Sequence, residues 1–203
     1  GCYETNVVGA VERIADHLAE PPPFTARQRY WCIRAKRIVL ATGALERLVA
    51  FSDNDRPGVM LANGALAAVQ RYAVAPGRRA VVLANNDEAY ETAFALAEAG
   101  TEVLCIVDPR AGSPIAEEAG RKGIEVRLEA EVVGTDGGDS LQAVAVASRA
   151  DGRTERLKAD LLCISGGHSP AIALASHAQV PSTWVEALQA FVADADAAHA
   201  KGI

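Results

Sequence analysis

The second half of the chain alternates short apolar runs with segments of helical periodicity. Ala80–Ala84 is a continuous apolar run, and the amphipathic segment after it has Asp87 placed to cap its first turn and Gly100 to end it. A second apolar run, Glu102–Val107, ends at Asp108. Buried strands have this uninterrupted apolar character, and a helix between two of them completes a β-α-β unit. We therefore predict β-α-β units in this part of the chain.

The next segments alternate apolar and polar residues, as half-buried antiparallel strands do. Asp-Gly turn sequences separate three of them: Ile124–Val133, Leu141–Ser148 and Thr154–Lys158. A last buried strand, Asp160–Ser165, then runs into two glycines. This order of elements is typical of a dinucleotide-binding domain with a β-meander.

The two ends of the chain have patterns of their own. Residues 1–50 read as β structure and finish in the apolar run Arg37–Thr42, which we expect to be a short buried strand closed by Gly43. A polar turn over 52–58 precedes a predicted helix over Met60–Tyr72. Near the other end, apolar residues recur at helical spacing over Trp184–Ala198 and predict an amphipathic helix.

Together these patterns predict an α/β chain. A three-layer, Rossmann-like domain of the FAD/NAD(P)-binding type, with a β-meander, is joined to part of a second dinucleotide-binding domain. The predicted divisions are 1–76 for the partial domain and its linker helix, 77–170 for the Rossmann-like domain, and 171–203 for a C-terminal helical return segment. Pro76 and Gly77 mark the first boundary.

Composition narrows the class of protein. The 203 residues are 50% hydrophobic and 23% charged, with a net charge of −6. Such a chain is too apolar for intrinsic disorder, and none of its apolar runs reaches the ~18–20 residues of a membrane-spanning helix. The 20 basic residues are scattered, which argues against a general nucleic-acid binder. We expect a globular protein with neither nucleic acid nor membrane as a partner.

Cysteine and histidine spacing excludes several kinds of site. The four cysteines lie far apart without a CxxC pair, so neither a redox pair nor a zinc knuckle is predicted: Cys2, Cys32, Cys105 and Cys163. Cys105 and Cys163 lie inside apolar runs, and we expect both to be buried. The low cysteine density favours a cytoplasmic location. The four histidines share no ligand spacing, and we predict no metal site.

The turn after the first buried strand departs from the usual nucleotide-binding sequence. A Rossmann unit has G-x-G-x-x-G here, because a bulky Cβ would keep the backbone from the pyrophosphate. Residues 84–89 read Ala-Asn-Asn-Asp-Glu-Ala, and Asp87 and Glu88 put carboxylates where a phosphate would sit. The acid ending the second strand stands where a ribose-binding residue would, although a strand-end Asp also serves as a cap. The candidate contacts of this unit are Asn85, Asn86 and Asp108.

Two other strands end in small residues. Ala41–Gly43 follows an apolar strand, as in the second contact strand of flavoprotein dinucleotide domains, although strand–Thr–Gly also occurs as a plain turn. Ser165–His168 closes the last strand and is the analogous crossing back to the first domain. The candidate cofactor contacts in these two sequences are Ala41, Thr42, Gly43, Gly166 and Gly167.

Four long runs carry a specific resemblance. They are KRIVLATGALER (Lys36–Arg47), FSDNDRPGVMLANGA (Phe51–Ala65), APGRRAVVLANNDEAYETAFALAEAG (Ala75–Gly100) and DLLCISGGHSP (Asp160–Pro170). These runs resemble the alpha subunit of heterotetrameric sarcosine oxidase, and the likeness extends to about Phe191. Since that subunit is far longer, the resemblance is to its central part.

The resemblance implies an oxidoreductase subunit. The family's complex demethylates sarcosine with FAD, FMN and a bound NAD, and tetrahydrofolate accepts the one-carbon unit. The implied partners are the beta and smaller subunits. Carried over by matching motif, the NAD contacts are those of Ala41–Gly43, with a backbone contact near Val7 or Val8. We expect no catalytic residue within the chain, because the electron chemistry belongs to the cofactor.

Alternatives remain at this point. Leu48 stands where the family tends to have proline, and His168 where an aromatic residue is usual, which leaves opine and proline oxidases open. A nucleotide-free scaffold or interaction module, without any cofactor in this chain, is a second hypothesis. A stand-alone NAD(P)H:flavin reductase ranks last, because the glycine motifs are missing. We expect the isolated chain to be inactive, and an exposed strand edge in residues 1–75 would favour a homodimer.

Overall fold

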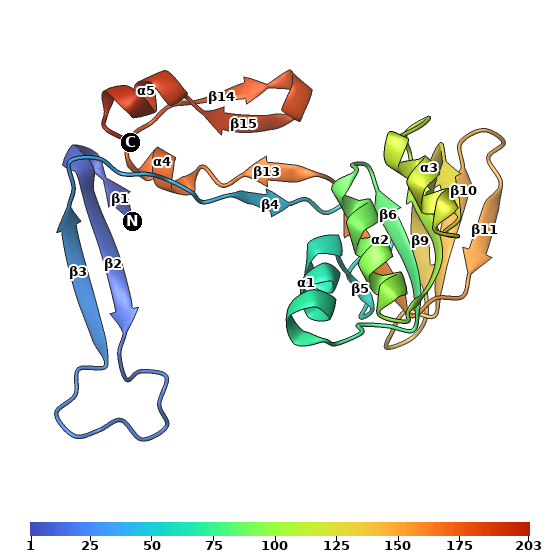
Figure 1. Ribbon diagram of the computed structural model, residues 1–203, viewed down its shortest axis with the longest axis horizontal. Coiled ribbons are helices and arrows are strands. Elements are labelled where there is room, and N and C mark those ends of the chain that lie inside the picture. The colour runs from blue at the N-terminus through green and yellow to red at the C-terminus, as the bar shows by residue number, and fades with distance from the viewer. The chain divides into compact units, whose positions relative to one another are not determined.

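The computed structural model describes residues 1–203, with the side chain of Glu4 left aside. The chain forms two compact units, whose elements are labelled in Figure 1. The first unit comprises Gly1–Leu45 together with Ser169–Ile203, and the second comprises Glu46–His168. No described helix is long and apolar enough to cross a lipid bilayer. The domain divisions at 76 and 170 stay a prediction.

A five-stranded parallel sheet is the centre of the second unit. Its strand order is β5–β12–β6–β7–β8, and each neighbouring pair runs parallel. The strands are β5 (Val59–Leu61), β12 (Leu161–Ser165), β6 (Arg79–Ala84), β7 (Glu102–Asp108) and β8 (Val126–Leu128). The apolar runs predicted as buried strands are β6, β7 and β12, and the residues of β6 and β12 are almost all inaccessible to solvent.

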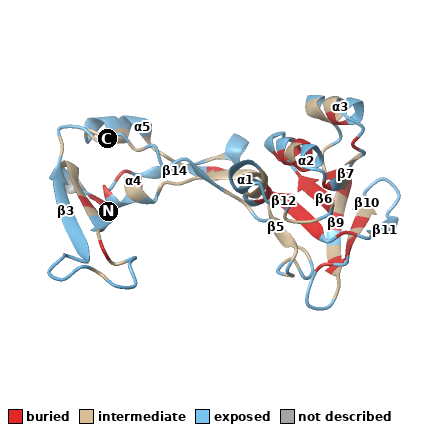
Figure 2. Cartoon of the chain, turned by 60° about the horizontal axis from the view of Figure 1, so that its bottom comes forward, coloured by how far each residue is buried: buried red, intermediate tan, exposed pale blue. Residues whose placement is uncertain are grey.

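Both faces of this sheet are covered. Successive side chains of a strand point to opposite faces, so Val82 of β6 packs among helical residues while Val81 packs against the antiparallel strands. The helices are α1 (Ala62–Tyr72), α2 (Glu88–Glu98) and α3 (Pro114–Arg121). The antiparallel sheet has the order β11–β10–β9 and consists of β9 (Ala130–Asp136), β10 (Ala143–Ser148) and β11 (Thr154–Leu157). Figure 2 shows the central strands largely as buried. The predicted three-layer α/β fold with a β-meander is confirmed.

One predicted strand is divided between two sheets. The segment Ile124–Val133 forms β8 of the parallel sheet and then β9 of the antiparallel one. Glu129 lies between them with a positive φ of 50°, which turns the chain from one layer to the other. Alternation of apolar residues continues across this break, so the pattern alone did not reveal it.

The first unit is built from hairpins and short helices. Its antiparallel sheet has the order β1–β2–β3, with β1 (Cys2–Tyr3), β2 (Val7–Arg13) and β3 (Gln28–Arg34), and a 3-10 turn, η1 (Glu4–Asn6), joins β1 to β2. Strands β4 (Ala44–Glu46) and β13 (His168–Pro170), which contain the two divisions of the chain, pair as a two-stranded sheet. The remaining elements are α4 (Ala173–His177), β14 (Ser182–Val185), η2 (Glu186–Leu188), β15 (Ala190–Ala193) and α5 (Ala195–Ala200). A small apolar core includes Cys2, Ala175 and Val180.

The predicted buried strand over Arg37–Thr42 is wrong. None of these residues lies in a strand, and Val39 is 89% exposed. A strand needs neighbours for its backbone groups, and Ile38 instead donates its N–H to the carbonyl of Gly202 at 2.9 Å. The run is apolar, but none of its residues is buried, and the pairing that would make it a strand is not formed within the described unit.

The predicted helix over Trp184–Ala198 is also wrong. Most of the segment is the hairpin β14–β15 with the 3-10 turn η2 at its tip, and only α5 at its end is α-helical. Trp184 and Phe191 face each other across the hairpin with ring centroids 5.3 Å apart. Gln189 supplies a left-handed residue (φ 48°) at the turn. A seven-residue spacing of aromatic residues fits both two helical turns and a cross-strand pair, and here the cross-strand pair forms.

Candidate functional site

The carboxyl ends of β6, β7 and β12 lie at one edge of the parallel sheet. In doubly wound α/β folds, ligands bind in the crevice outside this edge. All the predicted contacts of the second unit end or directly follow these three strands: Asn85, Asn86, Asp108, Gly166 and Gly167. The structure therefore brings these residues to one edge, although their role as cofactor contacts stays a prediction.

Asn86 holds the turn between β6 and α2. Its side-chain oxygen accepts the N–H of Ala89 at 3.2 Å, and its amide nitrogen donates to the hydroxyl of Ser165 at 2.9 Å. Asp87, which the sequence predicted as the helix cap, makes no capping hydrogen bond. The asparagine side chain, not the aspartate, satisfies an N–H of the first turn and ties the turn to the end of β12.

Asp108 is completely buried at the end of β7. The hydroxyl of Tyr90 in α2 donates to its carboxylate at 2.8 Å. Arg110 donates to it from its backbone N–H at 2.9 Å, from Nε at 3.0 Å and from Nη2 at 2.7 Å. A buried carboxylate needs such partners, because an unpaired charge in an apolar interior is strongly unfavourable.

Arg110 also reaches the turn that precedes α2. Its Nη1 donates to Asp87 at 2.8 Å, and the hydroxyl of Ser113 donates to the same oxygen at 2.7 Å. One guanidinium therefore joins Asp87, at the end of β6, to Asp108, at the end of β7. Hydrogen bonds from Ser113 and then Arg110 hold the pKa of Asp87 below its usual value, so this carboxylate is ionised at neutral pH.

Tyr90 and Arg110 keep their protons in this network. Burial, and then the hydrogen bond to Asp108, raise the pKa of Tyr90. The hydrogen bond to Asp108 raises the pKa of Arg110. Both groups therefore act as fixed donors. Neither was found by the sequence analysis, although a lone Asp in a buried strand, with an arginine two residues later, was a signal that could have revealed the pair.

Gly166 and Gly167 allow two backbone segments to meet. The N–H of Gly166 donates to the carbonyl of Arg47, and the N–H of Arg47 donates to the carbonyl of Gly167, both at 2.8 Å. A Cβ at Gly166 would lie 2.9 Å from the carbonyl oxygen of Arg47. Next to them, Nε2 of His168 lies 3.0 Å from the side-chain nitrogen of Asn63. In this structure the two glycines allow the backbone after β12 to approach the backbone of Arg47 closely.

The predicted contacts of the first unit are Val8, Ala41, Thr42 and Gly43. Thr42 and Gly43 line a cavity of about 500 Å³, whose walls are otherwise almost entirely apolar and include Ile38, Leu40 and Ile203. The hydroxyl of Thr42 is engaged, since it donates to the carbonyl of Ala171 at 2.7 Å. Val8 packs against the same small core as Ile38 and Leu40, and Ala41 is exposed.

All four cysteines are free thiols. Cys105 and Cys163 are buried in the second unit, as predicted, and burial raises the pKa of each to about 12. Cys2 is buried and Cys32 is exposed in the first unit. A thiol with so high a pKa is almost entirely protonated at neutral pH, so neither Cys105 nor Cys163 is suited to thiol–disulfide exchange.

Comparison with known sequences confirms the resemblance to sarcosine oxidase alpha subunits. The chain is 42% identical over 193 residues to the sarcosine oxidase alpha subunit of Rhizobium meliloti (strain 1021), which covers 95% of the chain and 19% of that protein. It is 39% identical over 207 residues to the alpha subunit of Corynebacterium sp. (strain P-1), covering 98% of the chain and 21% of that protein. The chain thus spans about a fifth of the length of these relatives.

Solved structures share the fold. Thioredoxin reductase of T. acidophilum has a TM-score of 0.60 at 14% identity, over 77% of this chain and 53% of that one. L-proline dehydrogenase from P. horikoshii has a TM-score of 0.57 at 21% identity, over 82% of this chain and 30% of that one. The pyridine nucleotide-disulphide oxidoreductase family matches residues 24–191. The chain therefore belongs to the pyridine nucleotide-disulphide oxidoreductase family.

Proposed function

We propose that the chain is part of the alpha subunit of a sarcosine oxidase-type complex, which oxidatively demethylates a secondary amine. One observation carries the proposal: sequence identity of 38–42% to sarcosine oxidase alpha subunits extends over 95% or more of the chain. It covers both compact units, although the described residues show no catalytic motif. The beta and smaller subunits of such a complex are the proposed partners, and the cytoplasm is the proposed location.

The reaction sets what the complex must supply. Sarcosine, dioxygen and water give glycine, formaldehyde and hydrogen peroxide, as two electrons leave the N-methyl group and water adds to the resulting iminium carbon. A bound flavin provides the electron acceptor for such a step, and tetrahydrofolate can take the one-carbon unit. We propose no catalytic residue within this chain, whose contribution to the step is to position other groups.

A pyridine nucleotide fits the two units unequally. In the first unit, Gly43 has a left-handed φ of +65°, no atom lies within 4 Å of the place of a Cβ, and the adjoining cavity wall is apolar. These features suit close approach of a flat ring or a ribose, and we propose Val8, Ala41, Thr42 and Gly43 as contacts for NAD. In the second unit, Asp87, Arg110 and Asp108 are bonded to one another at the edge of the sheet. The second unit does not fit the cofactor.

A second candidate function is oxidation of a cyclic or substituted amine by a related complex. The likeness in fold to L-proline dehydrogenase favours it, and so does His168, held beside Asn63 in place of an aromatic residue. The isolated chain is inactive under either proposal, because the chemistry depends on cofactors and subunits outside its own residues.

The test uses the native complex, isolated through an affinity tag on this chain. Formaldehyde and hydrogen peroxide are measured with sarcosine, proline, an opine and other N-methyl amino acids as substrates, and glycine serves as the matched control without an N-methyl group. We expect sarcosine to have the highest kcat/KM and formaldehyde to form with it. A preference for proline or an opine would establish the second candidate instead. Absence of amine oxidation with every substrate would overturn both.

A further inference from the structure

The edge of the parallel sheet offers three groups to a dinucleotide in a Rossmann unit. These are the free N–H groups of the helix N-terminus, a glycine turn without side chains, and an acid that binds the ribose hydroxyls. In this chain the N–H of Ala89 is bonded to the side chain of Asn86, and the turn carries the ionised side chain of Asp87. The acid, Asp108, is completely buried. One N–H of the helix N-terminus and the acid at the strand end are thus engaged, and side chains replace the glycine turn.

Arg110 connects the replaced groups. All three of its guanidinium nitrogens are used, with Nε and Nη2 on Asp108 and Nη1 on Asp87. An arginine after the second strand can also bind the 2′-phosphate of NADP. Here the same arginine already has two carboxylates as partners, and one of them belongs to the turn that a pyrophosphate would have to approach.

Opening this network is unfavourable. A ribose could reach Asp108 only if Arg110 or Tyr90 moved away, and the buried carboxylate would then lose a charged or hydrogen-bonding partner. A pyrophosphate at the turn would meet the negative charge of Asp87. Both halves of a dinucleotide are therefore opposed, one by loss of a partner and the other by repulsion.

We infer that Arg110, held between Asp87 and Asp108, takes the dinucleotide's place and excludes NAD and NADP from the second unit. Arg110 and Asp87 then determine specificity by excluding dinucleotides from this edge of the sheet. Arg110 also closes this edge of the sheet, because its hydrogen bonds hold the β6–α2 turn against the end of β7. The inference holds whichever amine the complex oxidises, so it goes beyond the proposed function.

The first test is hydrogen–deuterium exchange of the native complex, with and without NAD⁺, NADH or NADP⁺ as separate probes. Amides of residues 85–90, and of residues 108–113 apart from Pro109, report on this edge of the sheet. We expect their exchange rates to be unchanged at every probe concentration, including concentrations that saturate a site elsewhere in the complex. Protection of residues 85–90 by NAD⁺ or NADH, or of residues 108–113 by NADP⁺, would overturn the inference. Activity towards amines is a separate readout, so failure of either proposal leaves the other standing.

Variants test whether Arg110 closes the crevice. Arg110→Ala should raise the exchange rates of amides 85–90 by about tenfold or more, because the turn loses its link to β7. Arg149→Ala is the matched control, since it removes an exposed arginine paired only with Glu131, and it should leave those rates unchanged. The double variant Asp108→Asn, Arg110→Leu removes both charges and provides the same measurement without a buried unpaired carboxylate. Unchanged exchange at residues 85–90 in either folded variant would contradict the closure.

Discussion

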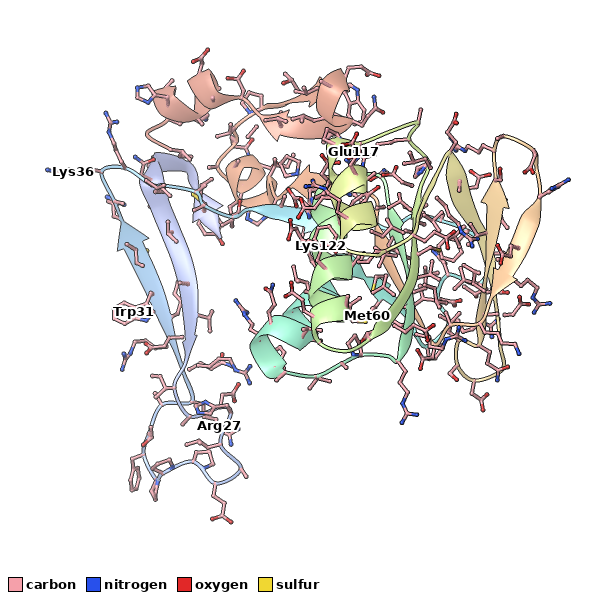
Figure 3. All side chains as sticks on the ribbon, turned by 45° about the vertical axis from the view of Figure 1, so that its right-hand side comes forward. Arg27, Trp31, Lys36, Met60, Glu117 and Lys122 are labelled. Carbon is pink, nitrogen blue, oxygen red and sulfur yellow. The ribbon has the colours of Figure 1, made fainter. Side chains whose placement is uncertain are left out.

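The two compact units of the chain bury their apolar residues to very different extents. In the second unit, strands β6 and β12 are covered on both faces, and Val81, Val82 and Leu162 are inaccessible. In the first unit every residue of β3 is exposed, including Trp31, which Figure 3 labels on that strand. Since burial of apolar surface drives folding, the second unit has the features of an independently stable domain and the first has few of them.

The same difference separates the two groups of predicted cofactor contacts. Asn86 and Asp108 both have hydrogen-bonding partners within the protein, Ser165 for Asn86 and Arg110 for Asp108. Thr42 and Gly43 line an apolar cavity, and the surroundings of Gly43 are open. A nucleotide motif can thus keep its position in the fold while its polar groups are taken over by the protein.

Loss of the central arginine should have the largest effect on stability. Arg110→Ala leaves Asp108 buried with Tyr90 and a backbone N–H as partners, and we expect unfolding of the second unit to be easier by about 3 kcal/mol. Urea denaturation followed by far-UV circular dichroism measures the change. Arg149→Ala, in an exposed ion pair, should change stability by less than about 0.5 kcal/mol. Equal effects of the two substitutions would show that the network is not a stabilising feature.

Two glycine substitutions in the second unit should change its stability in opposite directions. Gly166→Ala places a Cβ 2.9 Å from the carbonyl oxygen of Arg47 and 3.0 Å from that of Leu48, which should destabilise the unit by about 1–3 kcal/mol. Gly120→Ala lies in α3 with no atom within 4 Å of the new Cβ, and it should stabilise by about 0.5–1 kcal/mol. Thermal unfolding of both variants measures the pair. A destabilising Gly120→Ala would contradict the helix as described.

The aromatic pair of the first unit should contribute less. Trp184→Ala removes the partner of Phe191 across β14 and β15, and we expect a loss of about 1 kcal/mol that is confined to this hairpin. Amide exchange of residues 182–193 measures it, with Thr183→Ala as the control on the same strand. Faster exchange in the second unit as well would mean that the two units unfold together.

The smallest effect concerns pH. The pKa of Asp87 lies below its usual value of 3.8, so its ion pair with Arg110 contributes stability above that pH and loses it as the pH falls through the lower, folded value. Because the side chain of Asp87 is half exposed, the contribution should stay below about 1 kcal/mol. The stability of the wild type should fall below pH 4, whereas Asp87→Asn should show a smaller fall. Identical profiles of stability against pH for the two proteins would show that the ion pair of Asp87 with Arg110 does not contribute to stability.

The sequence predicted elements well where successive apolar runs are joined by a helix in one β-α-β unit. The apolar runs of β6 and β7 were identified in this way, with α2 between them. Prediction failed for Arg37–Thr42 and for Trp184–Phe191, because strand pairing there depends on which segments meet in space. The spacing of apolar residues indicates which face of a segment tends to be buried, but not which segment it pairs with.

The candidate site shows the same limit. Asp108 was found from its position at the end of an apolar strand, about twenty residues after the turn. Its partner Tyr90 lies 18 residues earlier in the chain, and Asp87 lies 23 residues before Arg110. These contacts depend on α2 packing over the edge of the sheet, which a sequence pattern does not give. The sequence thus indicated which turn had changed, and the structure showed what replaced the nucleotide's contacts.

A cryo-EM map of the native complex prepared with excess NAD⁺ would show directly whether Arg110 keeps the nucleotide out of the second unit. We expect the guanidinium of Arg110 to lie between Asp87 and Asp108, and we expect no nucleotide density beside residues 85–89. Any bound nucleotide of this chain would then lie beside Thr42 and Gly43. Density for a pyrophosphate at residues 85–89, with Arg110 displaced from Asp108, would contradict this expectation.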